Sequence, residues 1–337
     1  MKKLVPLCVI FQLVFVFQLT GQAQLKKANL GDIVLENGKI IENCHLEYRT
    51  FGTLNQDRSN VVLFPAWLGG TSEQLIGFIG KDKFVDDTKY FVVAVDPIGN
   101  GVSTSPSNYI GHAESDFPIY TIGDMVKIEH LLLTKVFGIQ QLSGVIGMSM
   151  GGHEVFEWIV SYPSFVKKAI SIVGTPRMTG YEKLYWQTQL EIMKAYQSCD
   201  SCSKGKFLSL WLFLFAYSAD YQNEIIQGNN FNQFLSQVRE VEFNINDYSS
   251  QIRAIQSHDV ISKNGGSFEQ TASLVKADLM IIVEMKDLIC NPNTAIEFAN
   301  LVGGQIQKLS SPCGHISFVC ETGLYSDLVR EFFNKSN

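Results

Sequence analysis

The chain has 337 residues, of which 46% are hydrophobic and 18% are charged, and its formal net charge is −6. This length suits one large or two small domains, and the apolar content is enough for a sizeable core. The net negative charge provides no basic surface for a nucleic acid, so we expect no nucleic-acid partner.

The N-terminus has the pattern of an export signal. Residues 1–3 carry two lysines, residues 4–19 are mostly apolar, and residues 20–23 end in small side chains that a signal peptidase reads. Residues 1–23 are therefore predicted to be a signal peptide, and the mature protein to be periplasmic or secreted. An uncleaved anchor is the alternative. It is disfavoured because the run is short and no second span follows, so we expect no stable membrane span after cleavage.

The segments that follow predict a sheet. Residues 31–52 read as an antiparallel hairpin, because two strand-like segments flank the turn residues Glu36, Asn37 and Gly38. Short apolar runs then occur at 60–64, 90–95, 143–147, 168–173, 279–283 and 306–309. Apolar runs that alternate with helical stretches predict an α/β fold, with a mostly parallel central sheet flanked by helices.

A G-x-S-x-G sequence centred on Ser149 lies between the apolar run 143–147 and a helix-like segment. This order predicts a strand, a sharp turn and a helix, with the hydroxyl of Ser149 lifted clear of the sheet. Gly147 and Gly151 allow the strained backbone and the helix to come close without Cβ clashes. The N–H of Met150 would lie at the helix N-terminus, where it can stabilise an oxyanion. The alternative is a Gly-rich turn without chemistry.

Residues 177–265 differ from the rest of the chain in being helix-like and rich in aromatic residues. We interpret them as a helical lid inserted between two parts of the core, residues 24–176 and 266–337. The apolar run 207–217 either packs within this lid or lines an acyl pocket or a membrane surface. Cys199 and Cys202 are the obvious candidates for a local disulfide, because an isolated C-x-x-C without a second ligand pair predicts no zinc site.

A serine hydroxyl needs a base within hydrogen-bond reach and a third group that orients the base. In this architecture the acid follows a late strand and the histidine follows the last one. Asp287 lies just past the run 279–283, and His315 lies in the loop after the run 306–309. Asp278 precedes its strand and Glu284 still belongs to it, so neither suits the acid.

Three other histidines are weaker candidates. His153 lies on the helix that leaves the turn, and we expect it to pack or cap there. His112 and His258 are expected to have surface roles, with a place in the wall of the pocket as the alternative for either.

The loop 65–71 should supply a second oxyanion donor. Its glycines allow backbone N–H groups to turn inward, and Leu68 is the best candidate, with Trp67 as the alternative. Attack by Ser149 would produce an acyl-serine, which water releases by hydrolysis or an alcohol releases by acyl transfer. No metal or redox cofactor is implied. Late in the chain, Cys290, Cys313 and Cys320 are expected to be small buried apolar residues.

Several stretches together resemble the homoserine O-acetyltransferase family of α/β-hydrolase-fold enzymes. They are residues 48–60, 79–81, 117–126, the turn at Ser149, residues 253–259, Asp287 and residues 314–315. The resemblance implies an α/β-hydrolase fold with an inserted lid. It implies a triad of Ser149, Asp287 and His315, with oxyanion roles for the N–H groups of Leu68 and Met150.

Departures from the family pattern favour its hydrolase-like branch. The family has an aspartate that holds the substrate amine directly after the catalytic histidine, where this chain has Ile316. The lid arginine of the family has no clear match among the basic residues Lys183, Lys194, Lys204, Lys206 and Arg239. Export would also separate the enzyme from acetyl-CoA, which would be a co-substrate only for an acyltransferase.

The sequence therefore predicts a serine enzyme that hydrolyses a small ester through an acyl-Ser149 intermediate. One alternative is an O-acyltransferase, and a second is a non-catalytic binding protein on the same fold. The expected partner is a small-molecule ester or acyl donor. The oligomeric state stays open, with a homodimer among the states it allows.

Overall fold

The computed structural model describes residues 23–197, 204–226, 230–238 and 244–335. The predicted signal peptide lies outside the described residues except for Ala23, so its cleavage stays a prediction. Cys199, Cys202 and Arg239 also lie outside, and the predicted local disulfide is therefore untested.

The described residues form one eight-stranded sheet, with the order β1-β2-β4-β3-β5-β6-β7-β8. The strands are β1 (Lys26–Val34), β2 (Ile40–Phe51), β3 (Val61–Pro65), β4 (Phe91–Asp96), β5 (Leu142–Met148), β6 (Val166–Ile172), β7 (Asp278–Glu284) and β8 (Gln305–Leu309). β1 pairs with β2 and β2 with β4 in antiparallel fashion, whereas all pairs from β4 to β8 are parallel. The predicted hairpin, the predicted strands and the mostly parallel sheet are confirmed.

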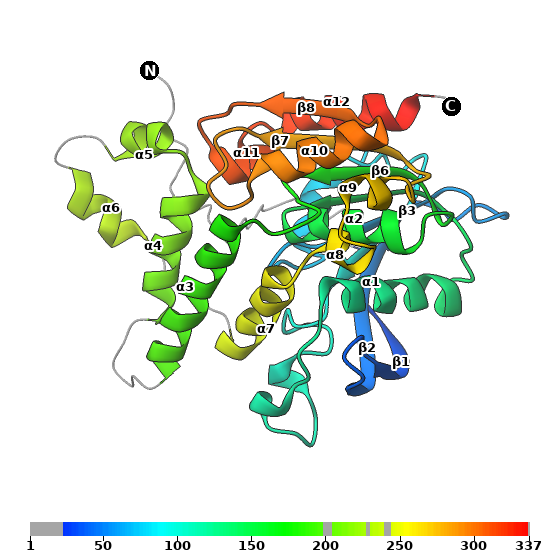
Figure 1. Cartoon of the computed structure of the whole chain (residues 1–337), viewed down its shortest axis with the longest axis horizontal. Coiled ribbons are helices and arrows are strands. Elements are labelled where there is room, and N and C mark those ends of the chain that lie inside the picture. Colours follow the sequence, from blue (N-terminus) through cyan, green and yellow to red (C-terminus); the bar gives the residue numbers. More distant parts are fainter. Residues whose placement is uncertain (1–22, 198–203, 227–229, 239–243, 336–337) are drawn as a thin grey trace.

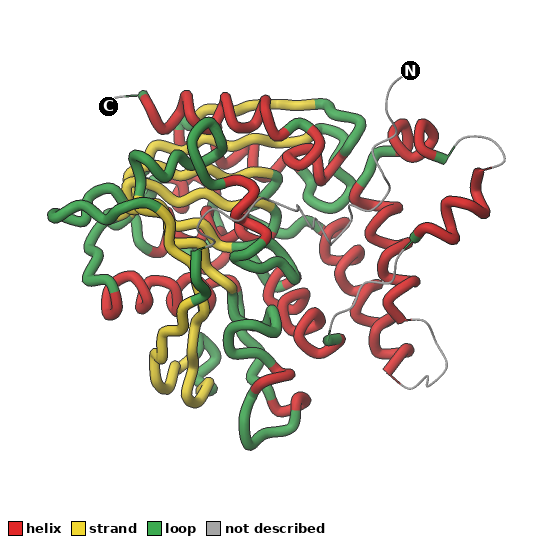
Figure 2. Tube along the Cα trace, turned by 180° about the vertical axis from the view of Figure 1, so that it is seen from behind, coloured by secondary structure: helices red, strands yellow, loops and turns green. Residues whose placement is uncertain are grey.

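Helices cover both faces of this sheet, which forms the middle layer in Figure 2. Alternate side chains of β3 reach opposite cores: Leu63 joins one apolar cluster, and Phe64 joins the other. The first cluster includes residues of α1 (Ile122–Leu131), α2 (Met150–Ser161) and α10 (Pro292–Val302). The second includes residues of α12 (Thr322–Asn334). Burial on both faces explains why β3, β4, β5 and β7 are apolar along most of their length.

Further helices connect or extend these layers. Short α-helices are α8 (Val260–Lys263), α9 (Phe268–Ala272) and α11 (Ser317–Cys320). Single turns of 3₁₀ helix occur at Gln74–Phe78, Pro106–Asn108, Glu114–Asp116 and Gly314–Ile316, and a π-helical turn at Leu132–Val136 extends α1.

A group of helices separates β6 from β7 in the chain. They are α3 (Gly180–Gln197), α4 (Lys204–Ala216), α5 (Ala219–Ile225), α6 (Phe231–Gln237) and α7 (Ile245–Gln256). Figure 1 shows α3 to α6 to one side of the sheet, with α7 between them and the core. The exact limits of a lid at 177 and 265 stay a prediction.

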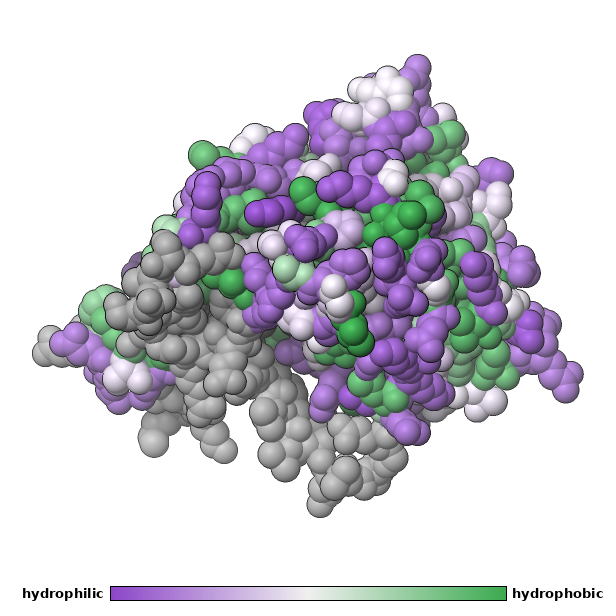
Figure 3. Space-filling view, turned by 90° about the horizontal axis from the view of Figure 1, so that it is seen from below, coloured by the Kyte–Doolittle hydropathy of each residue, from purple (hydrophilic) through white to green (hydrophobic). Residues whose placement is uncertain are grey.

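The outer surface mixes residue types. On the face seen in Figure 3, hydrophilic residues cover much of the visible surface and apolar residues are scattered among them. Among the described helices, none has both the length and the apolar character required to cross a membrane.

Two glutamates are buried together between the helices that support the sheet. Glu129 of α1 and Glu154 of α2 are each at most 1% exposed, and the indole N–H of Trp158 donates to Glu129 at 2.9 Å. Burial raises the pKa of Glu129 from 4.5 to about 7, and burial together with the charge of Glu129 raises the pKa of Glu154. The pair therefore stays protonated to a higher pH than glutamates that are exposed to water.

This pair predicts that stability falls as the pH rises. Between about pH 4.5 and 7 the unfolded chain releases the Glu129 proton while the folded chain keeps it, so the free energy of unfolding decreases. Glu129→Gln keeps a neutral acceptor for Trp158. Between pH 4.5 and 7 the free energy of unfolding of this variant should therefore decrease less than that of the wild type, and the difference should be on the order of 1–3 kcal/mol. Urea unfolding at pH 4.5 and 7 measures the difference. The exposed Glu297→Gln serves as control, and equal slopes for E129Q and wild type would contradict the prediction.

Candidate active site

Ser149 stands on a strained turn between the end of β5 and the start of α2. Its φ is 54° and its ψ is −117°, which is rare for a residue with a side chain. Its N–H donates to the carbonyl of Ile172 at 2.9 Å, and its carbonyl accepts from the N–H of His153 at 3.0 Å. A Cβ atom at Gly147 would overlap the carbonyl of Gly151. The turn therefore requires glycine there, as the sequence pattern predicts.

The structure brings the three predicted residues together. His315 Nε2 lies 2.9 Å from Ser149 Oγ, and His315 Nδ1 lies 2.7 Å from Asp287 Oδ2. An ionised carboxylate can only accept hydrogen bonds, so Nδ1 carries the proton and Nε2 is free to accept from the serine hydroxyl. The side chains of His315 and Asp287 are 7% and 1% exposed. This arrangement can withdraw a proton from Ser149 and stabilise the resulting imidazolium.

Asp287 is held by its own loop. Its second oxygen, Oδ1, accepts from the N–H groups of Ile289 at 2.7 Å and Cys290 at 2.9 Å. One carboxylate oxygen is thus fixed by the backbone while the other faces His315. The two rejected acids lie elsewhere: Asp278 begins β7 at its opposite end, and Glu284 is buried and accepts from the N–H of Ser311 at 2.9 Å.

The loop that carries His315 is closed by a disulfide, which the sequence analysis missed. Cys313 and Cys320 are joined by an S–S bond of 2.07 Å, so the prediction that both are small apolar residues is wrong. The pairing depends on how α11 folds back beside the loop, which the sequence pattern does not reveal. Two observations in the sequence could have indicated the pair. Cys313 and Cys320 lie on either side of His315, and the chain has six cysteines after the predicted cleavage site. Cys290 is a buried free thiol, as predicted.

The predicted oxyanion donors lie at neighbouring strand ends. Leu68 follows β3 and Met150 follows β5, and these two strands pair in parallel. Gln251 of α7 fixes the first loop, because its Oε1 accepts from the N–H of Gly69 at 2.8 Å while its Nε2 donates to the carbonyl of Ile98 at 3.1 Å. The sequence analysis did not identify Gln251, whose role depends on the position of α7. Neither Leu68 nor Met150 is tested as a donor, and both stay predictions.

Two further histidines lie behind the site rather than in it. His153 is fully buried, and its Nδ1 accepts from the N–H of Thr175 at 3.0 Å, as expected for a packing residue. His258 is also buried and its ring stacks on His153 at 5.5 Å, so its predicted surface role is wrong. Burial lowers the pKa of His258 to about 3 and that of His153 well below its usual value. Both are neutral near pH 7, and their ring nitrogens bond the backbone of Thr175 rather than Ser149 Oγ.

One group of side chains has the composition of a metal site. Asp287, Cys290 and His315 each bring a potential ligand atom within 4.8 Å of the others. Asp287 and His315 already bond each other, however, and burial raises the pKa of the Cys290 thiol and keeps it protonated. The group therefore suits proton transfer better than metal binding. The expectation that no metal is needed stays a prediction.

The disulfide beside His315 should support the reactivity of Ser149. The bridge between Cys313 and Cys320 lowers the conformational entropy of the unfolded chain, which raises the free energy of unfolding by about 2–3 kcal/mol. It also holds the loop that carries His315. The double variant Cys313→Ser, Cys320→Ser should react with a fluorophosphonate about tenfold more slowly at Ser149, because misplacement of the base weakens proton withdrawal. Labelling rates by mass spectrometry test this.

A dithiol reductant provides the control for that prediction. It should slow the wild type to the rate of the double variant and leave the variant itself unchanged. Unaltered labelling of the double variant, with an intact fold by circular dichroism, would contradict a positioning role.

Comparisons with known proteins identify the family of this chain. The family model of the alpha/beta hydrolase fold matches residues 60–321. An ethyl acetate hydrolase of Pseudomonas veronii is 38% identical over 200 residues, which cover 55% of this chain and 57% of that protein. A homoserine O-acetyltransferase of Methanohalophilus mahii is 27% identical over 345 aligned positions, which cover 88% of this chain and 70% of that protein.

A solved structure, an acetylester hydrolase from Corynebacterium glutamicum, matches with a TM-score of 0.82 and 27% identity, covering 93% of this chain and 96% of that one. The chain spans about half the length of the curated esterases that it matches, at 51% and 57%. The family model covers more than half of the chain, and esterases and homoserine O-acetyltransferases are both among its relatives. The chain therefore belongs to the alpha/beta hydrolase fold family.

Proposed function

We propose that this protein is a serine esterase that hydrolyses small esters through an acyl-Ser149 intermediate. The observation that carries the proposal is the hydrogen-bond chain from Asp287 through His315 to Ser149, with distances of 2.7 and 2.9 Å. Relatives described as an ethyl acetate hydrolase and an acetylester hydrolase support this chemistry.

The reaction follows from the roles of these groups. His315 Nε2 takes the proton of Ser149 as Oγ attacks the ester carbonyl, and the N–H groups of Leu68 and Met150 stabilise the oxyanion. Collapse of the tetrahedral intermediate breaks the C–O bond, and the leaving alcohol takes the proton from His315. Water then attacks the acyl-serine with His315 again as base, which releases the acid and restores Ser149. Asp287 remains ionised and stabilises the imidazolium in both steps.

The residue after His315 favours hydrolysis over transfer to an amino alcohol. Ile316 is half-buried and aliphatic, so it cannot pair with the ammonium group of homoserine. Lys183 and Lys194, two of the basic residues considered in place of the lid arginine of the acyltransferases, are exposed on α3. An O-acyltransferase remains the second candidate, because the likeness to a homoserine O-acetyltransferase extends over 88% of the chain.

We further propose that the protein acts outside the cytoplasm. The basic and apolar pattern of residues 1–23 supports export, and the disulfide between Cys313 and Cys320 suits an oxidising compartment. Acetyl-CoA is a cytoplasmic compound, so this location also favours water as the acceptor. The proposed partner is a small-molecule ester, and no cofactor is required.

The triad predicts a large effect of neutralising its acid. Asp287→Asn should lower kcat for p-nitrophenyl acetate by on the order of 10³–10⁴-fold with little change in KM, because the amide no longer fixes the protonated Nδ1 or stabilises the imidazolium. Ser149→Ala should abolish turnover. Stopped-flow absorbance measures both. A residual rate within tenfold of wild type in Asp287→Asn would argue against the assigned acid, and an active Ser149→Ala against the nucleophile.

The acceptor preference is tested by restoring a carboxylate after the histidine. With p-nitrophenyl acetate and excess homoserine, the wild type should form mainly acetate. Ile316→Asp should raise the ratio of O-acetylhomoserine to acetate by about tenfold, because a charge-assisted hydrogen bond would hold the amine. Mass spectrometry quantifies both products, with Ile316→Leu as the matched control. Abundant O-acetylhomoserine from the wild type would favour the acyltransferase. If folded wild type neither turns over esters nor reacts with a fluorophosphonate, the protein is a binding protein.

A further inference from the structure

The loop of residues 66–72 begins directly against the turn that carries Ser149. A Cβ atom on Gly151 would lie 2.8 Å from the carbonyl oxygen of Pro65 and 3.5 Å from that of Ala66. Gly151 lies in the first turn of α2, two residues after Ser149. The backbone of the loop therefore starts beside the nucleophile, where a donor to the oxyanion is needed.

Most N–H groups of this loop already have an acceptor. The N–H of Gly70 donates to the carbonyl of Trp67 at 2.8 Å, which together with a φ of 66° at Gly69 fits a type II turn. The other bonds run from Ala66 to the carbonyl of Val95, from Gly69 to Oε1 of Gln251, from Thr71 to Oε1 of Gln74 and from Ser72 to Oδ1 of Asp96. Within the described residues, the N–H groups of Trp67 and Leu68 have no acceptor, so they remain available to a substrate.

Asp96 holds the far end of the loop. It ends β4 and is fully buried, and its Oδ1 accepts from the N–H of Ser72 at 2.9 Å. Asn100 adds a second connection, because its Nδ2 donates to the same Oδ1 at 3.3 Å and to the carbonyl of Gly70 at 3.0 Å. One buried carboxylate oxygen thus fixes this part of the loop to the end of a central strand.

Gln251 holds the loop next to Leu68. Its side chain is fully buried and bridges two backbone groups, the N–H of Gly69 and the carbonyl of Ile98. The ring of Tyr248, on the same helix, packs against Gly69, since a Cβ atom there would lie 3.6 Å from it. Leu68 therefore lies between two anchored positions, with Ala66 bonded to β4 and Gly69 bonded to α7.

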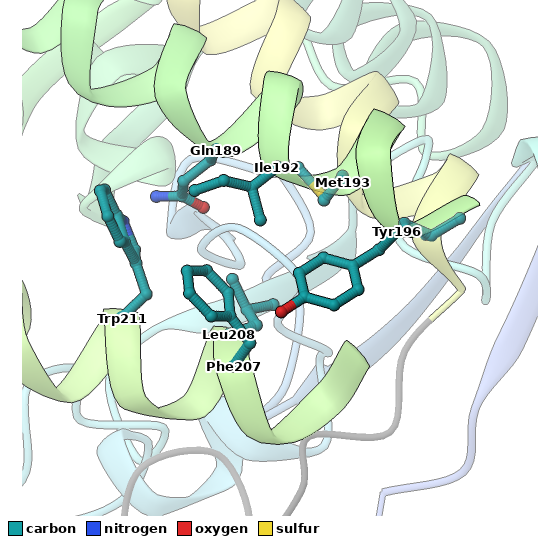
Figure 4. Close-up of a pocket in the computed structure, with 8 residues that line it drawn as sticks. Gln189, Ile192, Met193, Tyr196, Phe207, Leu208 and Trp211 are labelled. Carbon is teal, nitrogen blue, oxygen red and sulfur yellow. The ribbon is translucent and has the colours of Figure 1, made fainter. Parts of the chain in front are cut away.

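The helix that carries Gln251 is itself held by α3. The hydroxyl of Ser249 donates to Sδ of Met193 at 3.5 Å, and Nε2 of Gln256 donates to the carbonyl of Lys183 at 3.2 Å. Figure 4 shows Met193 among the mostly apolar side chains that line the space between α3 and α4. The position of Gln251 is therefore set by packing among the helices between β6 and β7, and not only by the loop that it holds.

We propose that Asp96 and Gln251 are positioning residues, which hold the N–H groups of Ser72 and Gly69 so that the N–H of Leu68 stays directed at the oxyanion formed on Ser149. This inference rests on the proposed esterase function and deepens it. A donor that is fixed in advance stabilises the developing charge without reorganisation. A loosened loop loses this advantage in the transition state, where the charge develops, so kcat falls while KM changes little.

Turnover of p-nitrophenyl acetate provides the first test. Gln251→Met removes both bonds of the amide with little change in size, and it should lower kcat by about 100-fold and change KM by less than about twofold. Gln256→Met is the matched control, because it removes an amide on the same helix that bonds α3 instead, and it should leave kcat unchanged. A Gln251→Met variant that is folded by circular dichroism and keeps the wild-type kcat would overturn the inference, as would an equal loss in Gln256→Met.

Asp96 is tested by a pair of substitutions. Asp96→Val removes the acceptor for Ser72 and should lower kcat about as much as Gln251→Met does. Asp96→Asn keeps an oxygen in that place and should restore most of the activity. Equal losses in the two variants would show that the charge matters rather than the bond to the loop, and would contradict the assigned role. Where Asp96→Val fails to fold, Asp96→Asn and Gln251→Met decide.

A ketone inhibitor separates the oxyanion donor from the triad. Ser149 Oγ adds to the carbonyl carbon of trifluoroacetone, its proton passes to His315, and the oxygen of the adduct becomes an oxyanion. The inhibition constant should rise in Gln251→Met by the same factor as kcat/KM falls, and the midpoint of the pH–rate profile should not move. An unchanged inhibition constant would overturn the inference. If the wild type binds the ketone but hydrolyses no ester, the proposed function fails, and the inhibition constants still decide whether Asp96 and Gln251 position the donor.

Discussion

The strained turn at Ser149 is the constraint on which the site depends. Its backbone is held at a positive φ by the bond from its N–H to Ile172 and by the close approach of α2, which Gly147 permits. Strain of this kind persists only where surrounding packing determines the conformation. The parallel strands provide that packing and also bring their carboxyl ends to one edge. Asp287 after β7 and His315 after β8 therefore meet a serine that follows β5, although more than 130 residues separate them from it in the chain.

Much of this arrangement follows from local sequence rules. The apolar runs predicted the strands, because a strand buried on both faces must be apolar along its length. Ser149 and His315 were identifiable because each occupies a fixed place in the order of strands and loops. The features that were missed depend on tertiary contacts. In the sequence His258 is an ordinary polar residue, and the packing of its segment against α2 buries it on His153. The pairing of Cys313 with Cys320 and the bond of Gln251 to the Gly69 loop depend on the positions of α11 and α7 in the same way.

The two chemistries of the family differ in the fate of one intermediate. Both require an acyl-serine, and the same triad and oxyanion donors would form it, so the triad alone does not separate an esterase from an acyltransferase. The separation depends on whether an acceptor alcohol is held near the acyl carbonyl long enough to exclude water. Ile316 beside His315 provides no charge for that purpose. The proposed preference for water is therefore a consequence of an absent binding interaction rather than of a different catalytic apparatus.

The buried polar groups around the site show how the core is held. Several of them are paired: His153 and His258 share the backbone of Thr175, Asp287 is held by two N–H groups, and Glu129 accepts from Trp158. Others have an atom without a partner among the described residues, as Nδ1 of His258 and the amide of Gln189 do. A buried polar group without a partner destabilises the fold, whereas a paired one fixes the position of its neighbours. The hydrogen bonds of His153 and Asp287 therefore hold the backbone on which the proposed chemistry depends.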